Sequence, residues 1–282
     1  MIDIEKIRAE TPGIDFSTHL LACGSSLMPQ SVVDVILEHT QLEALMGGYE
    51  AENKKIDDLN KIYDVVAEHI GASSREIALM ENSTVAWSHA FYAIPLKSGS
   101  RILTSEAEYA ANYVAFLQRA KRDNLIIDII PSDQNGTLDL NALETMIDER
   151  VGLIAISWIP TNGGLVNPAE NVGQVAKKYN IPYLLDACQA AGQMLIDVNK
   201  IECDFLSATG RKYLRGPRGT GFLYVKEKWL STIEPAMIDH FGAPWVKTNV
   251  YELREDARRF ETWENSYALR AGLGEAIKYA EE

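Results

Sequence analysis

The feature that most constrains the fold of this 282-residue chain is an alternation of short apolar runs with longer segments of helical periodicity. Seven runs have the length and composition of strands: 76–80, 101–105, 125–130, 152–159, 182–187, 204–209 and 221–225. Runs that are apolar on both sides are typical of a sheet covered on both faces, and the helical segments between them favour parallel pairing. The sequence therefore predicts an α/β fold of three α/β/α layers around a mixed, mostly parallel seven-stranded sheet.

Two further patterns refine this prediction. Only a glycine-rich segment separates 204–209 from 221–225, which is too short for a helical crossover and predicts an antiparallel pair there. Before the first strand, the spacing of apolar residues predicts helices over 31–46 and 52–71, the second of them closed by Gly71.

The end of the chain has its own pattern. From about residue 254 the sequence predicts one long helix, and the chain stops on it without a recognisable second core, as an interrupted domain would. The stretch 241–249 contains glycine and proline and is the best candidate boundary. We therefore expect an N-terminal arm (1–16), a large domain (17–245) and the start of an incomplete small domain (246–282).

Composition argues against several classes of function. The 27 basic and 40 acidic side chains give a net charge of −13, so neither nucleic acid nor a membrane is an expected partner. No stretch approaches the length of a membrane span, and the charged start lacks the apolar core of a signal peptide. Three separated cysteines suit a reducing compartment, and no HExxH pattern occurs. We expect a cytoplasmic protein without a metal site.

A first candidate binding motif follows the strand at 76–80. In ENSTVAW, Asn82, Ser83 and Thr84 open a helix and place hydroxyls and free backbone N–H groups where an anion is stabilised. The pattern predicts either a phosphate cup or plain helix capping. On this segment alone, capping is the favoured interpretation.

A second motif is LLDACQAAG, in which a buried strand ends on Asp186 and Gln189 follows three residues later. A carboxylate at this place can keep a pyridine nitrogen protonated, and the amide can bond a phenolic oxygen on the same ring. Taken alone, the acid could equally cap a helix or bind a ribose or a metal.

The third motif, LSATGRKYLRGPRGTGFLYV, is the most specific. Lys212 lies in it between two strands, and the cations Arg211, Arg215 and Arg218 would disfavour its charged form and offer donors to a phosphate. The alternative is a basic surface loop. No GxxxxGK[ST] is present, so the segment is not a nucleotide P-loop.

The last two motifs together resemble the class V aminotransferase group of fold-type I enzymes that use pyridoxal 5'-phosphate (PLP). The match covers most of the chain and implies a fold-type I PLP-dependent transferase fold with PLP as cofactor. The group includes cysteine desulfurases, isopenicillin N epimerase-like proteins and the sulfoxide lyases of ergothioneine synthesis. The segment ATGRKYLRGPRGTG is more similar to the latter two groups.

The resemblance implies a role for each matching residue. Lys212 would form the Schiff base with PLP and then move the proton at the substrate α-carbon. Asp186 would pair with the pyridinium nitrogen, and Gln189 would contact the phenolic oxygen. Residues that would hold the phosphate are Ser83, Thr84 and Thr209.

Other roles follow from the same resemblance. Tyr109 falls where many relatives place a histidine stacked on the cofactor ring, and its own ring is equivalent for stacking. Thr161 and Asn162 lie where relatives use an amide near the phenolic oxygen and the substrate, and either could serve. Arg218 and Thr220 would complete the phosphate site of a neighbouring subunit. A homodimer with its active site at the subunit interface is therefore expected.

The motifs constrain the cofactor more than the reaction. Among reactions on an amino acid, we rank carbon–sulfur lyase or desulfurase-like chemistry slightly above transamination and epimerisation. Relatives continue into a small domain that carries the arginine for the substrate carboxylate and, in desulfurases, the catalytic cysteine. Neither can be assigned here, and Cys23 and Cys188 are interpreted as small buried side chains.

Two alternatives belong to other classes of function. One is a non-catalytic PLP-fold domain that assembles with another chain, which steady turnover by this chain would make unnecessary. The other is a nicotinamide-dependent dehydrogenase, which is disfavoured because no GxGxxG follows the first strand.

Overall fold

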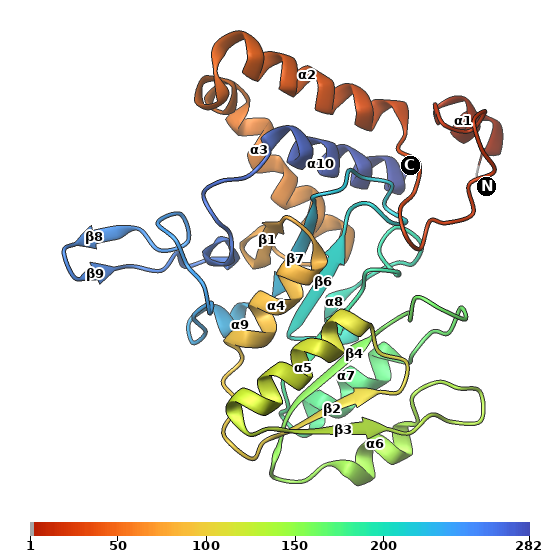
Figure 1. Cartoon of the computed structure of the whole chain (residues 1–282), viewed down its shortest axis with the longest axis vertical. Coiled ribbons are helices and arrows are strands. Elements are labelled where there is room, and N and C mark those ends of the chain that lie inside the picture. Colours follow the sequence, from red (N-terminus) through yellow and green to blue (C-terminus); the bar gives the residue numbers. More distant parts are fainter. Residues whose placement is uncertain (1–2) are drawn as a thin grey trace.

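The computed structural model describes residues 3–282 and centres on one seven-stranded sheet (Figure 1). Its order is β1-β7-β6-β5-β4-β2-β3. The strands are β1 (Ile77–Met80), β2 (Arg101–Ser105), β3 (Ile126–Ile130), β4 (Val151–Ser157), β5 (Tyr183–Asp186), β6 (Phe205–Thr209) and β7 (Gly221–Val225). All seven predicted runs form strands, so the predicted mixed sheet is confirmed.

Strand direction decides where a site can form. β7 runs antiparallel to both of its neighbours, β1 and β6, as the short connection predicted. The pairs β2–β3, β2–β4, β4–β5 and β5–β6 are parallel. The six strands other than β7 therefore end at the same edge of the sheet, where open α/β folds bind their ligands.

Helices cover both faces of the sheet, which gives the predicted three layers. Those packed on one face are α3 (Gly48–Ile70), α6 (Leu140–Met146), α7 (Ala169–Lys178), α8 (Val198–Ile201) and α10 (Tyr267–Glu281). Those on the other face are α4 (Ser83–Ala93), α5 (Ala110–Asp123) and α9 (Glu227–Leu230). Outside them, α2 (Gln30–Met46) lies on α3 and α10, and α1 (Ile4–Ala9) precedes it (Figure 1).

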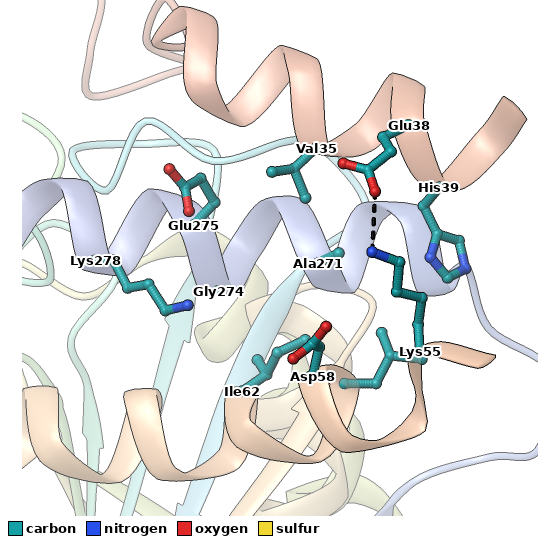
Figure 2. A pocket seen from close by; sticks show the side chains of 11 residues that line it. Val35, Glu38, His39, Lys55, Asp58, Ile62, Ala271, Gly274, Glu275 and Lys278 are labelled. Atoms are coloured by element: carbon teal, nitrogen blue, oxygen red, sulfur yellow. Dashed lines mark hydrogen bonds and ion pairs between the residues drawn. The ribbon is translucent and has the colours of Figure 1, made fainter. Parts of the chain in front are cut away.

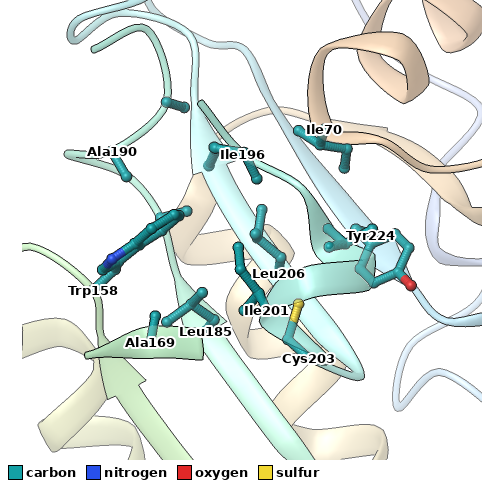
Figure 3. Close-up of a cluster of buried hydrophobic side chains, with 14 of the residues drawn as sticks. Ile70, Trp158, Ala169, Leu185, Ala190, Ile196, Ile201, Cys203, Leu206 and Tyr224 are labelled. Atoms are coloured by element: carbon teal, nitrogen blue, oxygen red, sulfur yellow. The ribbon is translucent and has the colours of Figure 1, made fainter. Parts of the chain in front are cut away.

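Two apolar cores lie between these layers. Neighbouring residues of a strand point to opposite faces, so Leu206 joins one core and Phe205 the other. Figure 3 shows part of the first core, where Trp158, Leu185 and Leu206 lie together under the helices of that face. This double burial explains why the strand runs are apolar at nearly every position.

The helices before the sheet were predicted closely. α3 ends at Gly71, which takes the left-handed conformation with φ +70° and donates its N–H to the last turn. Within the described part of the chain, no helix is both long enough and apolar enough to cross a bilayer.

The single long helix predicted from about residue 254 is wrong. The structure has a 3-10 helix (η2, Ala257–Phe260), an extended stretch, and then α10. The stretch 241–249, predicted as a boundary, contains β8 (Trp245–Lys247), which pairs with β9 (Val250–Tyr251) in a hairpin that projects from the body (Figure 1). The division into domains stays a prediction.

Glu261 explains the break before α10. Its carboxylate is buried and accepts hydrogen bonds from the Leu79 amide (3.0 Å) and the Tyr63 hydroxyl (3.0 Å). It also pairs with the Arg270 guanidinium at 2.9 Å. These tertiary bonds hold Glu261 in extended backbone, and a new helix begins where Ser266 caps the Leu269 amide.

Candidate active site

A cavity of about 450 Å³ opens at the edge where the six strands end. Four segments distant in sequence build it: the start of α4, the start of α5, the end of β5 and the loop between β6 and β7. Its lining residues are Glu81, Asn82, Ser83, Thr84, Val85, Tyr109, Asn112, Asp186, Cys188, Thr209, Arg211, Lys212, Arg218 and Gly219.

The start of α4 provides one wall. Asn82 caps the helix by accepting a hydrogen bond from the Val85 amide at 3.0 Å. Ser83 is buried and donates its hydroxyl to Ser207 at 3.0 Å, whereas Thr84 is exposed towards the cavity. Capping and an anion-binding geometry are therefore both present, because the cap leaves the remaining first-turn N–H groups beside the cavity.

Asp186 ends β5 inside this cavity and is buried. One carboxylate oxygen accepts from the Cys188 amide (2.9 Å) and the other from the Asn112 side chain (2.9 Å). Each carboxylate oxygen can accept more than one bond, so Asp186 keeps capacity for a donor in the cavity.

Lys212 lies on the loop after β6, and only 6% of its surface is exposed. Its amine is 5.6 Å from the centre of the Tyr109 ring. Tyr109 occupies the N-cap position of α5, where its side chain makes no capping hydrogen bond, and the residue is 40% exposed. The structure thus places the candidate lysine, aromatic ring and acid in the same cavity.

Gly192 allows the lysine loop to reach this position. Its φ is +91°, and a Cβ atom there would collide with the backbone of Tyr213 and Leu214. Only glycine accommodates both the left-handed conformation and the close approach. The final glycine of DACQAAG is thereby explained as a packing requirement of the Lys212 loop.

The arginines predicted to surround Lys212 separate in the structure. Arg211 and Arg218 line the cavity, and Arg211 donates to the Thr209 hydroxyl at 3.0 Å. Arg215 does not line it. Its guanidinium donates instead to the Leu27 carbonyl (3.0 Å) and the Thr11 hydroxyl (2.5 Å), so it anchors the N-terminal segment.

Four other predicted residues do not line the cavity. Thr220 is buried and donates its hydroxyl to the Pro217 carbonyl at 2.8 Å. The Gln189 amide nitrogen donates to the Cys23 carbonyl (3.1 Å) and to Thr161 Oγ1 (3.3 Å). Asn162 lies exposed in the same loop as Thr161. Their proposed contacts with a cofactor stay predictions.

The sequence interpretation missed two polar residues at the site. Asn112 lines the cavity and donates to both Asp186 (2.9 Å) and Glu108 (3.0 Å). Burial raises the pKa of Glu108 to about 7, and the nearby charge of Asp186 adds to the rise. Both flank Tyr109 in SEAEYAAN, and their spacing of four residues at a helix start is the signal that could have revealed them.

Cys188 lies in the cavity wall beside Asp186. Burial, and then the neighbouring carboxylate, raise the pKa of its thiol well above the ordinary value. A thiol that stays protonated is a poor nucleophile. Cys188 therefore behaves as the small buried side chain that the sequence predicted.

A second cavity, of about 190 Å³, lies between α2, α3 and α10 (Figure 2). Charges of both signs line it, including Lys55, whose amine donates to Glu38 at 2.9 Å. Lys212 and Asp186 do not line it, so this cavity lacks the chemistry of the candidate site.

The first cavity suits the cofactor that the sequence resemblance implies. A buried amine can bond an aldehyde, a carboxylate can hold a proton on a ring nitrogen, and an aromatic ring can stack. The α4 N-terminus and the Arg218 guanidinium supply donors for a phosphate. The donor set at the site therefore fits PLP.

Comparison with known proteins agrees with this geometry. Residues 18–282 match the family described as Aminotransferase class-V. The chain is similar to a probable cysteine desulfurase of Pyrococcus abyssi, with 27% identity over 99% of this chain and 70% of the relative. For a probable cysteine desulfurase of Synechocystis, the identity is 29% over 90% of this chain and 62% of the relative.

A solved structure gives the same result. The apo structure of a cysteine desulfurase from Thermococcus onnurineus NA1 superposes with a TM-score of 0.92 and is 27% identical in sequence. The superposition covers 100% of this chain and 71% of that chain.

Proposed function

Since the chain belongs to the class V aminotransferase family, we propose that it is a PLP-dependent enzyme that cleaves a carbon–sulfur bond of an amino acid. The family resemblance inferred from the motifs around Asp186 and Lys212 is confirmed by the match over residues 18–282. The observation that carries the proposal is the shared cavity of Lys212, Tyr109 and Asp186.

Each residue of the cavity has a task in this proposal. When bound, PLP supplies an electron sink for negative charge at the substrate α-carbon. Asp186 holds the proton on the ring nitrogen, and Tyr109 stacks on the ring. The Lys212 amine would hold the cofactor through its aldehyde and would move the proton at the substrate α-carbon. Being buried and beside the ring, the Lys212 amine is shielded from bulk water.

The phosphate has a separate set of donors. The Thr84 hydroxyl and the free amides of the α4 start lie on one wall, and Arg218 lies on the loop side. The hydroxyls of Ser83 and Thr209 donate to Ser207 (3.0 Å) and to the Thr220 carbonyl (3.3 Å), so they would have to turn from these partners to bind the phosphate. Because anions are stabilised at helix N-termini, the start of α4 would hold the phosphate of the cofactor, and Asp186 would pair with its ring nitrogen.

Carbon–sulfur cleavage is the reaction that the relatives favour. Both curated relatives and the solved structure described above are named as cysteine desulfurases. We therefore place a cysteine-like amino acid first among substrates, ahead of the transamination and epimerisation that the same cavity could perform.

We also propose a cytoplasmic homodimer with its active site at the subunit interface. Because Arg218 lines the cavity of its own chain and Thr220 is buried, the assignment of these two residues to the partner's phosphate site stays a prediction. Two exposed apolar side chains of the N-terminal segment, Phe16 (89%) and Leu20 (88%), offer surface for such an interface. Light scattering on the purified chain tests this part, and a monomer at high concentration would refute it.

An amino-acid panel with product detection tests the reaction. With PLP present, we expect L-cysteine or a cysteine S-conjugate to give pyruvate, ammonia and sulfide or the free thiol by elimination. With L-cysteine and an added thiol as sulfur acceptor, alanine and the persulfide of that thiol would instead establish desulfuration. A keto acid accompanied by pyridoxamine phosphate would instead establish transamination, and inverted stereochemistry would establish epimerisation. PLP bound without turnover of any amino acid would contradict the catalytic proposal and favour the assembly role.

A further inference from the structure

Glu108 joins the start of α5, which lines the cavity, to two strands of the sheet beside it. Its Oε1 atom accepts hydrogen bonds from the Tyr109 amide (2.7 Å), the Asn112 side chain (3.0 Å) and the Ser157 hydroxyl (2.5 Å). Its Oε2 atom accepts from the Ser157 amide (2.9 Å) and the Thr104 hydroxyl (3.1 Å). The carboxylate therefore ties the end of β2 and the end of β4 to the start of α5.

Asn112 carries this network to Asp186. One N–H of its amide points to Glu108 (3.0 Å) and the other to Asp186 (2.9 Å), so both hydrogens are used. The side chain is 3% exposed, which leaves it no alternative partner in solvent. The orientation of Asp186 thus depends on Asn112, and that of Asn112 depends on Glu108.

The surroundings of Glu108 disfavour a charged carboxylate, so a purely structural role for this residue would lower the stability of the fold. Burial disfavours its charged form, and Asp186 is a like charge beside it. Its hydrogen bonds nevertheless go to groups that position the cavity residues Tyr109 and Asn112. This pattern is typical of a residue that supports a functional site.

We propose that Glu108 is a positioning residue that, through Asn112 and the Tyr109 backbone, holds the Asp186 carboxylate and the Tyr109 ring ready for the cofactor ring. The inference rests on the proposed function, because a PLP ring is what Asp186 and Tyr109 would contact. It extends that function to a residue that lies behind the cavity wall.

Glu108→Gln tests the proposal with little change in size. If the new amide group replaces Oε1, it faces the N–H donors of Tyr109 and Asn112. If it replaces Oε2, it faces the Ser157 amide. Either orientation leaves at least one N–H group without an acceptor, so the hold on the start of α5 is weakened.

The first readout needs no cofactor. In protein labelled with ¹⁵N-asparagine, the Asn112 side-chain signals of the wild type should be protected from solvent exchange. We expect at least a tenfold loss of this protection in Glu108→Gln. Glu106→Gln, which changes an exposed carboxylate two positions away, is the matched control and should leave the Asn112 signals unchanged.

The second readout is PLP affinity, measured by visible absorbance. We expect the dissociation constant to rise at least tenfold in Glu108→Gln. In the double variant with Asn112→Ala, we expect a loss of binding free energy smaller than the sum of the two single losses, because part of the effect of Glu108 passes through Asn112. If Glu108→Gln does not fold, Asn112→Ala gives the test, because it breaks the bridge and leaves the other bonds of Glu108 in place.

The outcomes separate the two proposals. If Asn112 is protected in wild-type protein but PLP does not bind, the proposed function is overturned. The hydrogen bonds between Glu108 and Asn112 can then still be tested by the exchange measurement on Glu108→Gln. Wild-type protein that binds PLP, with unchanged affinity in Glu108→Gln, would overturn the positioning role whether or not Asn112 protection changes. Additive losses in the double variant would also overturn it.

Discussion

The Lys212 amine lies 5.6 Å from the centre of the Tyr109 ring, inside a cavity that Asp186 also lines. The three residues are widely separated in the sequence, and they meet because their segments all follow strands that end at one edge of the sheet. A buried amine, an aromatic ring and a carboxylate thus converge at one cavity without any single local motif containing all three.

Replacing Asp186 with asparagine tests the charge at the cavity floor. Asp186→Asn keeps the shape but removes the charge that would hold a proton on the ring nitrogen. We expect kcat/KM to fall by roughly 10²-fold or more, as when a preorganised electrostatic partner is removed. Steady-state kinetics with a confirmed PLP content would measure this, and activity within twofold of wild type would refute the role of Asp186.

Gly192→Ala tests the packing that seats the Lys212 loop. We expect it to destabilise the fold and weaken PLP binding, because the added methyl meets the backbone of Tyr213 and Leu214. Gly136→Ala is the matched control, since Gly136 also has positive φ (+83°) but a methyl group there would meet no atom within 4 Å. Overpacking should cost Gly192→Ala about 1–3 kcal/mol beyond the control. Equal losses in urea unfolding would show that the close approach is unimportant.

The buried pair of Glu261 and Arg270 should contribute strongly to stability. Arg270→Met would leave the Glu261 carboxylate buried without its cation, and we expect a loss of about 3–5 kcal/mol in the free energy of unfolding. Lys6→Met removes an exposed pair with Glu282 and should leave the free energy of unfolding almost unchanged. Similar losses for the two variants in urea unfolding would contradict a strong contribution from the buried pair.

The raised pKa of Glu108 predicts a pH dependence of stability in the cofactor-free protein. The folded state holds the Glu108 proton up to about pH 7, whereas the unfolded state releases it near the ordinary value of 4.5. Between these pH values the folded state binds more protons, so the free energy of unfolding falls as pH rises.

Glu108→Gln lacks this titration and isolates its effect. Relative to that variant, wild-type protein should lose up to about 3 kcal/mol of stability between pH 5 and pH 8. Urea unfolding of both proteins at the two pH values measures the difference. A gap that stays constant, or that moves in favour of wild type as pH rises, would contradict a raised pKa.

Most of the strands were predictable because they are buried on both faces, whereas Ile126 and Ile129 of the edge strand β3 are exposed. A run such as 221–225 is apolar at every position, and the absence of a helix between it and 204–209 correctly implied antiparallel pairing. The end of α3 was predictable from an equally local signal, because Gly71 has the conformation that glycine favours after a helix.

What the sequence did not reveal depends on contacts between distant segments. The apolar periodicity after residue 254 reads as one helix, but Glu261 is held in extended backbone by Tyr63, Leu79 and Arg270. Likewise, Arg215 reads as a cation near Lys212, yet its side chain turns to the N-terminal segment. Composition near a residue does not specify the direction of its side chain.

The most direct test of Lys212 as the residue that binds the cofactor is a PLP titration of the purified chain, followed by borohydride reduction and peptide mapping, with Lys212→Ala as control. We predict a visible absorbance band in the wild type and a cofactor fixed by borohydride on Lys212, with no trapping in Lys212→Ala. Folded protein that gives no band, or a cofactor fixed at another residue, would contradict the role of Lys212 and with it the proposed function.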